Sequence, residues 1–247
     1  MSAPTSLKTV SGLTSKRSLK VGGITPFTAT DYPGKLAAVV FVQGCPWRCG
    51  YCHNPHLQPR LSESSLAWQQ VLDLLQRRVG LIDAVVFSGG EPTIDAALAD
   101  AICAVRELGF DVGLHSAGTY PKRLAEILPL LDWVGLDIKA SFAQYDRITQ
   151  ITGSGHQARA AAEAVLASGV DYEFRTTIHP ALLPEAEVLA LAQSLAQMGA
   201  QKYVLQVFRA QGSQDDALAA AAMAGYPSDT LVRRVAQLFA HFSVRRS

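Results

Sequence analysis

Three cysteines stand close together in the first quarter of the chain. Cys45, Cys49 and Cys52 have the spacing C-x3-C-x2-C, on a segment that also contains glycine and proline. Three thiolates on one short loop can converge on a single metal centre, and soft sulfur ligands select an iron–sulfur cluster or zinc. A structural zinc site and a simple [4Fe–4S] cluster both need four ligands. Three cysteines would therefore leave one iron of a cluster open to a substrate or cofactor.

The alternative interpretation of the cysteine loop is a zinc site that a histidine completes. His53 and His56 both follow Cys52 closely enough to serve as the fourth ligand. The remaining cysteine, Cys103, lies among Ala, Ile and Val residues of a predicted helix. We expect Cys103 to be a small buried apolar side chain and not a ligand.

Polar residues stand at the ends of several predicted strands. Gly89 and Gly90 permit a tight turn and the close approach of a ligand, and Glu91 adds an acceptor for an ammonium group. Asp137 and Lys139 alternate at the end of a later strand, so their side chains should point to the same side. Charges at such positions are costly unless they are paired or bind a ligand. The bland alternatives are an ordinary turn and a structural Asp–Lys pair.

Six short apolar or β-branched runs alternate with six segments of helical periodicity. The predicted strands are Leu36 to Val42, Ala84 to Phe87, Asp111 to Leu114, Trp133 to Ile138, Tyr172 to Thr177 and Tyr203 to Phe208. The predicted helices cover Leu66 to Leu75, Ala97 to Leu108, Leu124 to Leu131, Ala158 to Leu166, Val188 to Leu195 and Leu231 to Phe242.

This alternation predicts an α/β fold with a parallel sheet, because parallel strands need crossover connections. Six units are fewer than the eight of a closed barrel, so periodicity leaves a doubly wound sheet and an incomplete barrel open. Ligands collect at the carboxyl ends of the strands in both folds, where the cysteine loop and Gly89–Glu91 lie. We expect a flexible leader over residues 1–20 and a single domain over 21–247.

Composition narrows the functional classes. The 247 residues are 49% hydrophobic and 17% charged, with a net charge of +1, so no basic surplus favours a nucleic-acid partner. No run of about 18 apolar residues predicts a membrane span, and no signal peptide is recognisable. Four cysteines, three of them clustered, fit a metal site better than a disulfide framework and favour a cytoplasmic location.

Together these motifs resemble the radical S-adenosylmethionine (SAM) superfamily. The C-x3-C-x2-C loop with an aromatic residue, Tyr51, before its last cysteine is similar to the signature of that superfamily. The run Gly89–Glu91 is similar to its glycine-rich motif, which binds the methionine amino group. The resemblance implies a partial (β/α)6 barrel with a [4Fe–4S] cluster held by Cys45, Cys49 and Cys52, and S-adenosyl-L-methionine as the second cofactor.

Within this superfamily the chain most resembles the enzymes that activate glycyl-radical enzymes. His53 and Asn54 follow Cys52 as in the activases' Cys-His-Asn motif, and Asp137 and Lys139 match their Asp-x-Lys motif near the methionine carboxylate. Arg175 matches an arginine on the fifth strand in the same pocket. The resemblance therefore implies that these residues bind the cofactor.

Two further segments refine the resemblance. The run Thr25 to Gly34 resembles the activating protein of anaerobic ribonucleoside-triphosphate reductase. At the end of the third strand, His115-Ser116-Ala117-Gly118 stands where activases often carry Asp-Thr-Asn-Gly, so the resemblance does not extend to their monovalent-cation site.

The implied reaction starts with one electron from a donor such as flavodoxin or ferredoxin. This electron cleaves SAM to methionine and a 5′-deoxyadenosyl radical, which takes a hydrogen atom from a glycine of a partner enzyme. We expect this partner to be anaerobic ribonucleoside-triphosphate reductase. The alternatives are a small-molecule radical SAM enzyme of the 7-carboxy-7-deazaguanine synthase type and, with less support, a zinc-binding adaptor.

Overall fold

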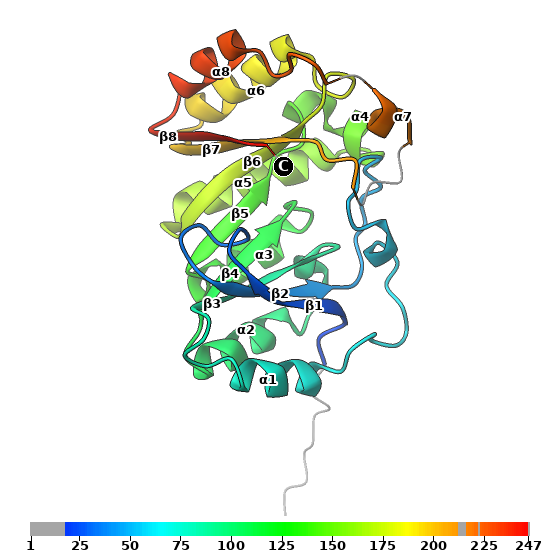
Figure 1. Ribbon diagram of the computed structural model, residues 1–247, viewed down its shortest axis with the longest axis vertical. Coiled ribbons are helices and arrows are strands. Elements are labelled where there is room, and N and C mark those ends of the chain that lie inside the picture. Colours follow the sequence, from blue (N-terminus) through cyan, green and yellow to red (C-terminus); the bar gives the residue numbers. More distant parts are fainter. Residues whose placement is uncertain (1–17, 212–215, 222, 247) are drawn as a thin grey trace, which may run out of the picture.

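The computed structural model describes residues 18–211, 216–221 and 223–246. A single eight-stranded sheet, in the order β1 to β8, carries the whole fold (Figure 1). Residues 1–17 of the expected leader lie outside the described residues, and Leu19 is already buried in the core. The strands are β1 (Val21–Thr28), β2 (Ala37–Val42), β3 (Ala84–Gly89), β4 (Asp111–Ser116), β5 (Trp133–Asp137), β6 (Asp171–Ile178), β7 (Lys202–Val207) and β8 (His241–Arg245).

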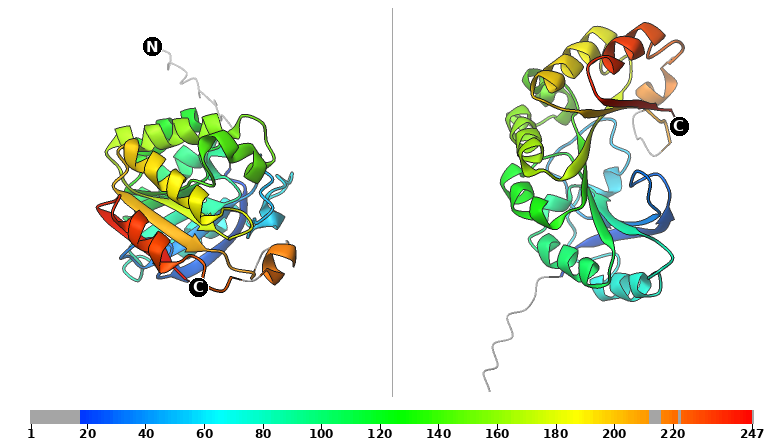
Figure 2. Two further views of the ribbon diagram at one scale, coloured as in Figure 1. Left: turned by 90° about the horizontal axis from the view of Figure 1, so that it is seen from above. Right: turned by 90° about the vertical axis from the view of Figure 1, so that its left-hand side faces the viewer.

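Helices follow the strands, and most of them lie on one side of the sheet, whereas α7 (Asp216–Ala220, orange) stands apart from that layer (Figure 2). The α-helices are α1 (Trp68–Gln76), α2 (Leu98–Glu107), α3 (Pro121–Ile127), α4 (Tyr145–Thr149), α5 (Ser154–Ser168), α6 (Glu185–Gln197), α7 (Asp216–Ala220) and α8 (Asp229–Ala236). The 3-10 turns are η1 (Pro55–Leu57), η2 (Pro92–Ile94), η3 (Leu128–Leu130) and η4 (Phe142–Gln144).

The sheet is an open half-barrel. Every neighbouring pair from β2 to β8 is parallel, and β1 pairs antiparallel with β2. Because β1 and β8 stand at opposite ends of the strand order, the barrel has a lateral opening between them (Figure 2). The predicted partial barrel is confirmed, and the doubly wound alternative is not.

The six predicted strands are all present as β2 to β7, and two edge strands were not predicted. In β1 the sequence contains two glycines and a proline, which weaken the strand pattern. The helix expected over Leu231 to Phe242 is wrong at its end, because α8 stops at Ala236 and β8 follows. Phe242 keeps the helical spacing in sequence, but it packs on Tyr203 of the sheet at 6.3 Å between ring centroids.

A second, small core fills the interior of the half-barrel at the end opposite the carboxyl ends of the parallel strands. The main core lies between the sheet and its helices, whereas Tyr32, Val39, Val86 and Trp133 belong to a separate inner cluster. The Tyr32 and Trp133 rings lie 5.1 Å apart. A Cβ atom on Gly113 would come within 3.0 Å of the Tyr32 ring, so the absence of a side chain there makes room for it. The β1–β2 turn thus plugs one end of the interior.

In the described part of the chain, no helix has the length and apolarity needed to cross a membrane. The expectation that Cys103 is buried is wrong, because its side chain is exposed on α2. The apolar neighbours Ile102 and Val105 carry the buried face of this helix, and Cys103 lies outside that face.

Candidate active site

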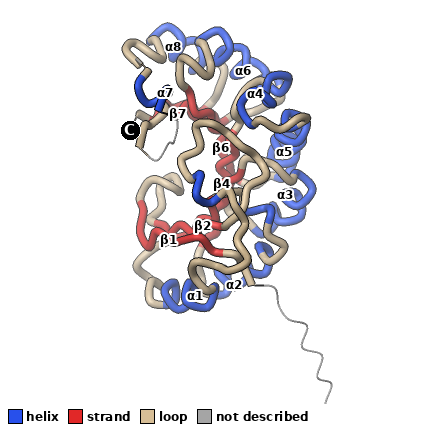
Figure 3. Tube along the Cα trace, turned by 90° about the vertical axis from the view of Figure 1, so that its right-hand side faces the viewer, coloured by secondary structure: helices blue, strands red, loops and turns tan. Residues whose placement is uncertain are grey.

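A cavity of about 910 Å³ lies at the end of the half-barrel where the parallel strands have their carboxyl ends. Figure 3 views this side of the molecule, with the long connection from β2 to α1 in front of the sheet. Eleven of the twelve predicted site residues line the cavity. They are Cys45, Cys49, Tyr51, Cys52, His53, Asn54, Gly89, Gly90, Asp137, Lys139 and Arg175.

The three clustered cysteines are free thiols, and each is partly buried. A turn closed by the hydrogen bond from Cys52 N to Cys49 O, at 3.2 Å, brings the last two together. Burial raises the pKa of Cys45 to about 12 and also raises the pKa of Cys49. Within the described ranges, no set of three or more His, Cys, Asp or Glu side chains could hold a single metal ion.

The chemistry of this loop nevertheless fits a sulfur-ligated cluster. Three thiols face one cavity, and soft thiolates are the ligands that iron–sulfur clusters use. Between them, Trp47 is buried, and its Nε1 donor has no hydrogen-bond acceptor in the described part of the chain. A buried donor without an acceptor is costly, which fits a bound group with acceptor atoms at this loop.

The two glycines after β3 bring bare backbone under the cysteine loop. Gly89 has φ +119°, a conformation that side chains strongly disfavour, and a Cβ atom on Gly90 would lie 2.4 Å from Gly44 O. Gly90 N donates to Val42 O at 2.9 Å, and Glu91 N donates to Gly44 O at 2.8 Å. These glycines therefore fix the cysteine loop against the end of β3 as well as lining the cavity.

Glu91 is the predicted site residue that the structure does not bring to the cavity. Its side chain is fully buried, and its carboxylate accepts four hydrogen bonds from protein groups. The donors are Thr93 N at 3.1 Å, Thr93 Oγ1 at 2.6 Å, Ser116 Oγ at 2.8 Å and Ala117 N at 2.9 Å. The Glu91 side chain thus ties the turn after β3 to the end of β4.

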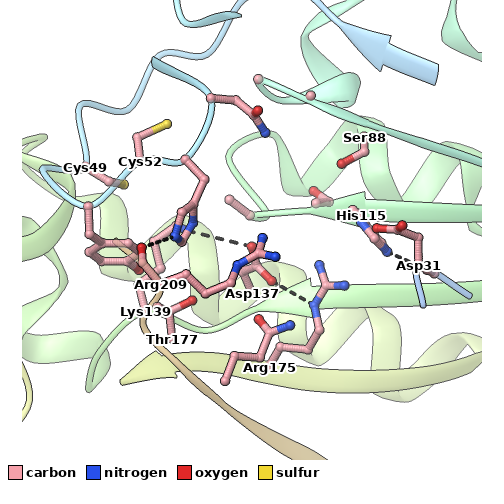
Figure 4. Close-up of a pocket in the computed structure, with 18 of the residues that line it drawn as sticks. Asp31, Cys49, Cys52, Ser88, His115, Asp137, Lys139, Arg175, Thr177 and Arg209 are labelled. Carbon is pink, nitrogen blue, oxygen red and sulfur yellow. Dashed lines mark hydrogen bonds and ion pairs between the residues drawn. The ribbon is translucent and has the colours of Figure 1, made fainter. Parts of the chain in front are cut away.

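Asp137, the last residue of β5, lies between two cations, Arg175 inside β6 and Lys139 just beyond β5. Arg175 Nε donates to Asp137 Oδ1 at 2.9 Å, and Lys139 Nζ lies 3.8 Å from Asp137 Oδ2 (Figure 4). Burial alone would raise the pKa of Asp137, but the neighbouring Arg175 and Lys139 lower it below its usual value. Two cations and one anion leave a net charge of +1. This group of three can therefore attract one further carboxylate.

The Arg175 side chain depends on a glycine in the neighbouring strand. Arg175 Nη2 donates to Gly135 O at 3.3 Å, and a Cβ atom on Gly135 would lie 2.7 Å from Arg175 Nη1. The structural Asp137–Lys139 pair considered from the sequence is present but long, and the shorter ion pair joins Asp137 to Arg175.

His53 connects the cysteine loop to the far side of the cavity. His53 Nε2 lies 3.1 Å from Arg209 O, and its ring is 5.7 Å from that of Phe208. Burial lowers the pKa of His53. Asn54 lines the cavity and accepts a hydrogen bond from Leu57 N at its backbone oxygen.

Several residues without a predicted role also line the cavity, among them Asp31, His115 and Arg209. His115 Nε2 lies 2.8 Å from Asp31 O, across the cavity from Cys49 and Cys52 (Figure 4). Arg209 follows β7 at the carboxyl edge, so its position after a strand could have indicated it. Asp31 had no such signal, because it reaches the cavity only through the path of the β1–β2 turn.

Comparison with known proteins agrees with this fold. The chain belongs to the radical SAM superfamily, whose match covers residues 39–195. It is therefore an enzyme that works with a [4Fe–4S] cluster and S-adenosylmethionine.

Its relatives include activating enzymes of glycyl-radical proteins. A putative glycyl-radical enzyme activating enzyme from Methanocaldococcus jannaschii is 29% identical over 207 residues, which are 79% of this chain and 82% of that protein. The pyruvate formate-lyase-activating enzyme of Clostridium pasteurianum is 34% identical over 141 residues, 55% of this chain and 58% of that protein. The crystal structure of QueE from Escherichia coli has the same fold, with a TM-score of 0.54, 17% identity, and coverage of 93% of this chain and 95% of that one.

Proposed function

We propose that this enzyme installs a glycyl radical on a partner protein, and that this partner is anaerobic ribonucleoside-triphosphate reductase. One relative is named a putative glycyl-radical enzyme activating enzyme and another a pyruvate formate-lyase-activating enzyme, which supports the class of partner. The run Thr25–Gly34 resembles the reductase activator, which supports the particular partner. Membership of the radical SAM superfamily argues against the zinc-binding adaptor.

In this proposal the cavity holds both cofactors. Cys45, Cys49 and Cys52 would hold the cluster, and Gly89 and Gly90 would present backbone oxygen atoms to the methionine amino group. When bound, the cluster and S-adenosylmethionine supply a 5′-deoxyadenosyl radical after one electron has broken the S–C5′ bond, with methionine as the other product. The protein groups bind and orient these cofactors and exclude competing reactions.

The observation that carries the proposal is the net positive group of Asp137, Lys139 and Arg175 in the same cavity as the cysteines. One unbalanced positive charge suits the methionine carboxylate of S-adenosylmethionine. Tyr51 extends this group, because Lys139 Nζ lies 5.4 Å from the centroid of its ring. His53 and Asn54 would contribute the remaining cavity wall beside the last cysteine.

The lateral opening between β1 and β8 suits a protein substrate. Hydrogen abstraction needs the glycine Cα at roughly 3–3.5 Å from the radical carbon, so a loop of the partner must enter the cavity. The electron would come from a flavodoxin or ferredoxin in the same compartment. Four free cysteines are compatible with the cytoplasm as that compartment.

Electron paramagnetic resonance tests this proposal. The reduced, iron-reconstituted protein should cleave S-adenosylmethionine slowly when it is alone. Anaerobic ribonucleoside-triphosphate reductase should speed cleavage and acquire a stoichiometric, oxygen-sensitive doublet signal. Deuterium placed on the target glycine should appear in 5′-deoxyadenosine. A doublet on another glycyl-radical protein and none on the reductase would support the activation of a glycyl-radical protein but show that the reductase is not the partner.

The second candidate is an enzyme that acts on a small molecule, as in the 7-carboxy-7-deazaguanine synthase class. The similarity to QueE covers nearly the whole chain but, at 17% identity, it supports the fold alone. Consumption of a free small molecule in step with cofactor cleavage, with no radical on any candidate protein, would favour this function.

A further inference from the structure

Tyr145 holds the turn that carries Lys139. Its side chain is fully buried at the start of α4, on the short connection that follows β5. The Tyr145 hydroxyl donates to Asp137 O at 3.1 Å and accepts from Lys139 N at 3.0 Å. One hydroxyl group therefore satisfies two backbone groups of the Asp-x-Lys turn, just where the ladder of β5 ends.

The neighbouring hydrogen bonds hold only part of the Asp-x-Lys turn. Ile138 N donates to Arg175 O at 2.7 Å, and Ile138 O accepts from Thr176 Oγ1 at 2.7 Å. These bonds fix the middle residue of the turn to β6 but not the residues on either side of it. The backbone of Lys139, whose side chain is only 12% exposed, is instead fixed by Tyr145.

The same short helix also contacts the cysteine loop. The Trp47 ring, between Cys45 and Cys49, meets the Tyr145 ring edge-on, with 5.5 Å between centroids. At the other end of α4, Thr149 O accepts a hydrogen bond from Arg48 N at 2.9 Å. Helix α4 thus binds the Lys139 turn through its first residue and the cysteine loop through its first and last residues.

We propose that Tyr145 is a positioning residue that sets the place of Lys139 relative to the cysteine loop. This inference rests on the proposed function, in which the methionine end of S-adenosylmethionine reaches both the cysteine-held group and Lys139. A single small ligand that bridges two protein elements binds tightly only when their separation is fixed beforehand. The two hydrogen bonds of the Tyr145 hydroxyl and the contact of its ring with Trp47 together fix the separation between the Lys139 turn and the cysteine loop.

The test compares S-adenosylmethionine affinity among four forms of the iron-reconstituted protein, by titration calorimetry. Tyr145→Phe keeps the ring and its contact with Trp47 but removes the hydroxyl. We expect it to retain the iron content of the unmodified protein and to bind the cofactor about tenfold more weakly, a loss within the range expected for the two hydrogen bonds removed. Lys139→Ala and the double variant complete the cycle.

The double variant separates positioning from a general structural role. If Tyr145 acts through Lys139, Tyr145→Phe should weaken binding no further once Lys139 is replaced by alanine. An equal loss in both backgrounds, or no loss in the single variant, would overturn the inference. If Lys139→Ala alone binds S-adenosylmethionine normally, the carboxylate site of the proposed function fails as well.

Tyr226→Phe is the matched control. Tyr226 is also buried, and its hydroxyl donates to the backbone oxygen of Leu183, away from the Asp-x-Lys turn. This variant loses a hydroxyl of the same kind and should keep the affinity of the unmodified protein. A tenfold loss here too would show that any buried tyrosine hydroxyl has this effect, and the specific role of Tyr145 would be wrong.

Discussion

At the scale of single residues, the charged residues of the family motifs are of two kinds. Asp137 lies between Arg175 and Lys139 and leaves a positive charge for a ligand. Glu91 already accepts four hydrogen bonds and lies outside the cavity. A charged residue in a family motif can therefore serve the ligand or the protein scaffold, and the hydrogen-bond partners distinguish the two.

Replacement of single cysteines tests the proposed ligands. Cys45→Ala, Cys49→Ala and Cys52→Ala should each reduce bound iron to background and abolish cofactor cleavage, because each thiolate would hold one iron of the cluster. Iron and acid-labile sulfide analysis measures the first effect. Cys103→Ala is the control, since this side chain is exposed on the outer helix α2. Loss of iron in that variant would contradict the assignment.

His115 should make the apo-protein less stable in mild acid. Burial, together with the nearby Arg175, lowers the pKa of His115 to about 3, whereas an unfolded histidine titrates near 6.5. Below about pH 6.5 the unfolded chain takes up a proton that folded His115 does not, so the free energy of unfolding falls as the pH decreases. This contribution is fully present above pH 6.5.

Urea unfolding at pH 7 and pH 5 measures this effect. The loss of unfolding free energy between the two pH values should be about 2 kcal/mol smaller in His115→Gln than in the unmodified protein. His241→Gln is the control, because His241 is exposed on β8 and should leave the difference unchanged. If the free energy of unfolding depends on pH equally in His115→Gln and in the unmodified protein, the lowered pKa of His115 is refuted.

At the scale of elements, the turn from β3 into η2 depends on the side chain of Glu91, a residue of the turn itself. Glu91→Ala leaves the donors of Thr93, Ser116 and Ala117 without their acceptor. We expect the free energy of unfolding to fall by about 3 kcal/mol, since buried unpaired donors cost roughly 1–3 kcal/mol each. Chemical denaturation followed by circular dichroism measures it.

A surface glutamate provides the comparison for that prediction. Glu163 is exposed on α5 and pairs with Arg159 one turn away. Its replacement by alanine should change the free energy of unfolding by about 0.5 kcal/mol or less. Similar small losses in both variants would mean that the Glu91 hydrogen bonds do not stabilise the turn.

At the scale of the whole molecule, the two hydrophobic cores stabilise the fold, and the cofactor is not part of them. The main core lies between the sheet and its helices, and the inner core of Tyr32 and Trp133 closes the opposite end of the half-barrel. No cysteine of the loop is among the buried residues of either core, and Cys45 and Cys49 pack against the main core only as partly buried side chains. The half-barrel should therefore remain folded without the cluster.

Removal of iron by chelation tests this independence. The far-ultraviolet circular dichroism spectrum should keep its shape, and the melting temperature should fall by only a few degrees, because the loss is confined to one loop. Hydrogen exchange should increase in the connection from β2 to α1 and stay unchanged in β3 to β6. Collapse of the whole spectrum on chelation would show that the cluster is part of the folding core.

The sequence by itself determined the local features of this protein. Spacing of the cysteines, the glycine pair after β3 and the alternation of Asp137 with Lys139 are one-dimensional patterns, and eleven of the twelve predicted site residues line the cavity. The six parallel strands followed from apolar runs of the right length. Their carboxyl ends must meet at one edge because every crossover returns the chain to the same side.

The tertiary structure decided what depends on contacts between distant segments. β1 and β8 are strands because their neighbours offer free edges, and their own sequences are weak predictors. Asp31 reaches the cavity through the path of a turn, and Tyr145 acts on the Lys139 backbone through a short helix. The Glu91 carboxylate is taken up by donors that include Ser116, 25 residues away. Such partners follow from packing, which no local pattern encodes.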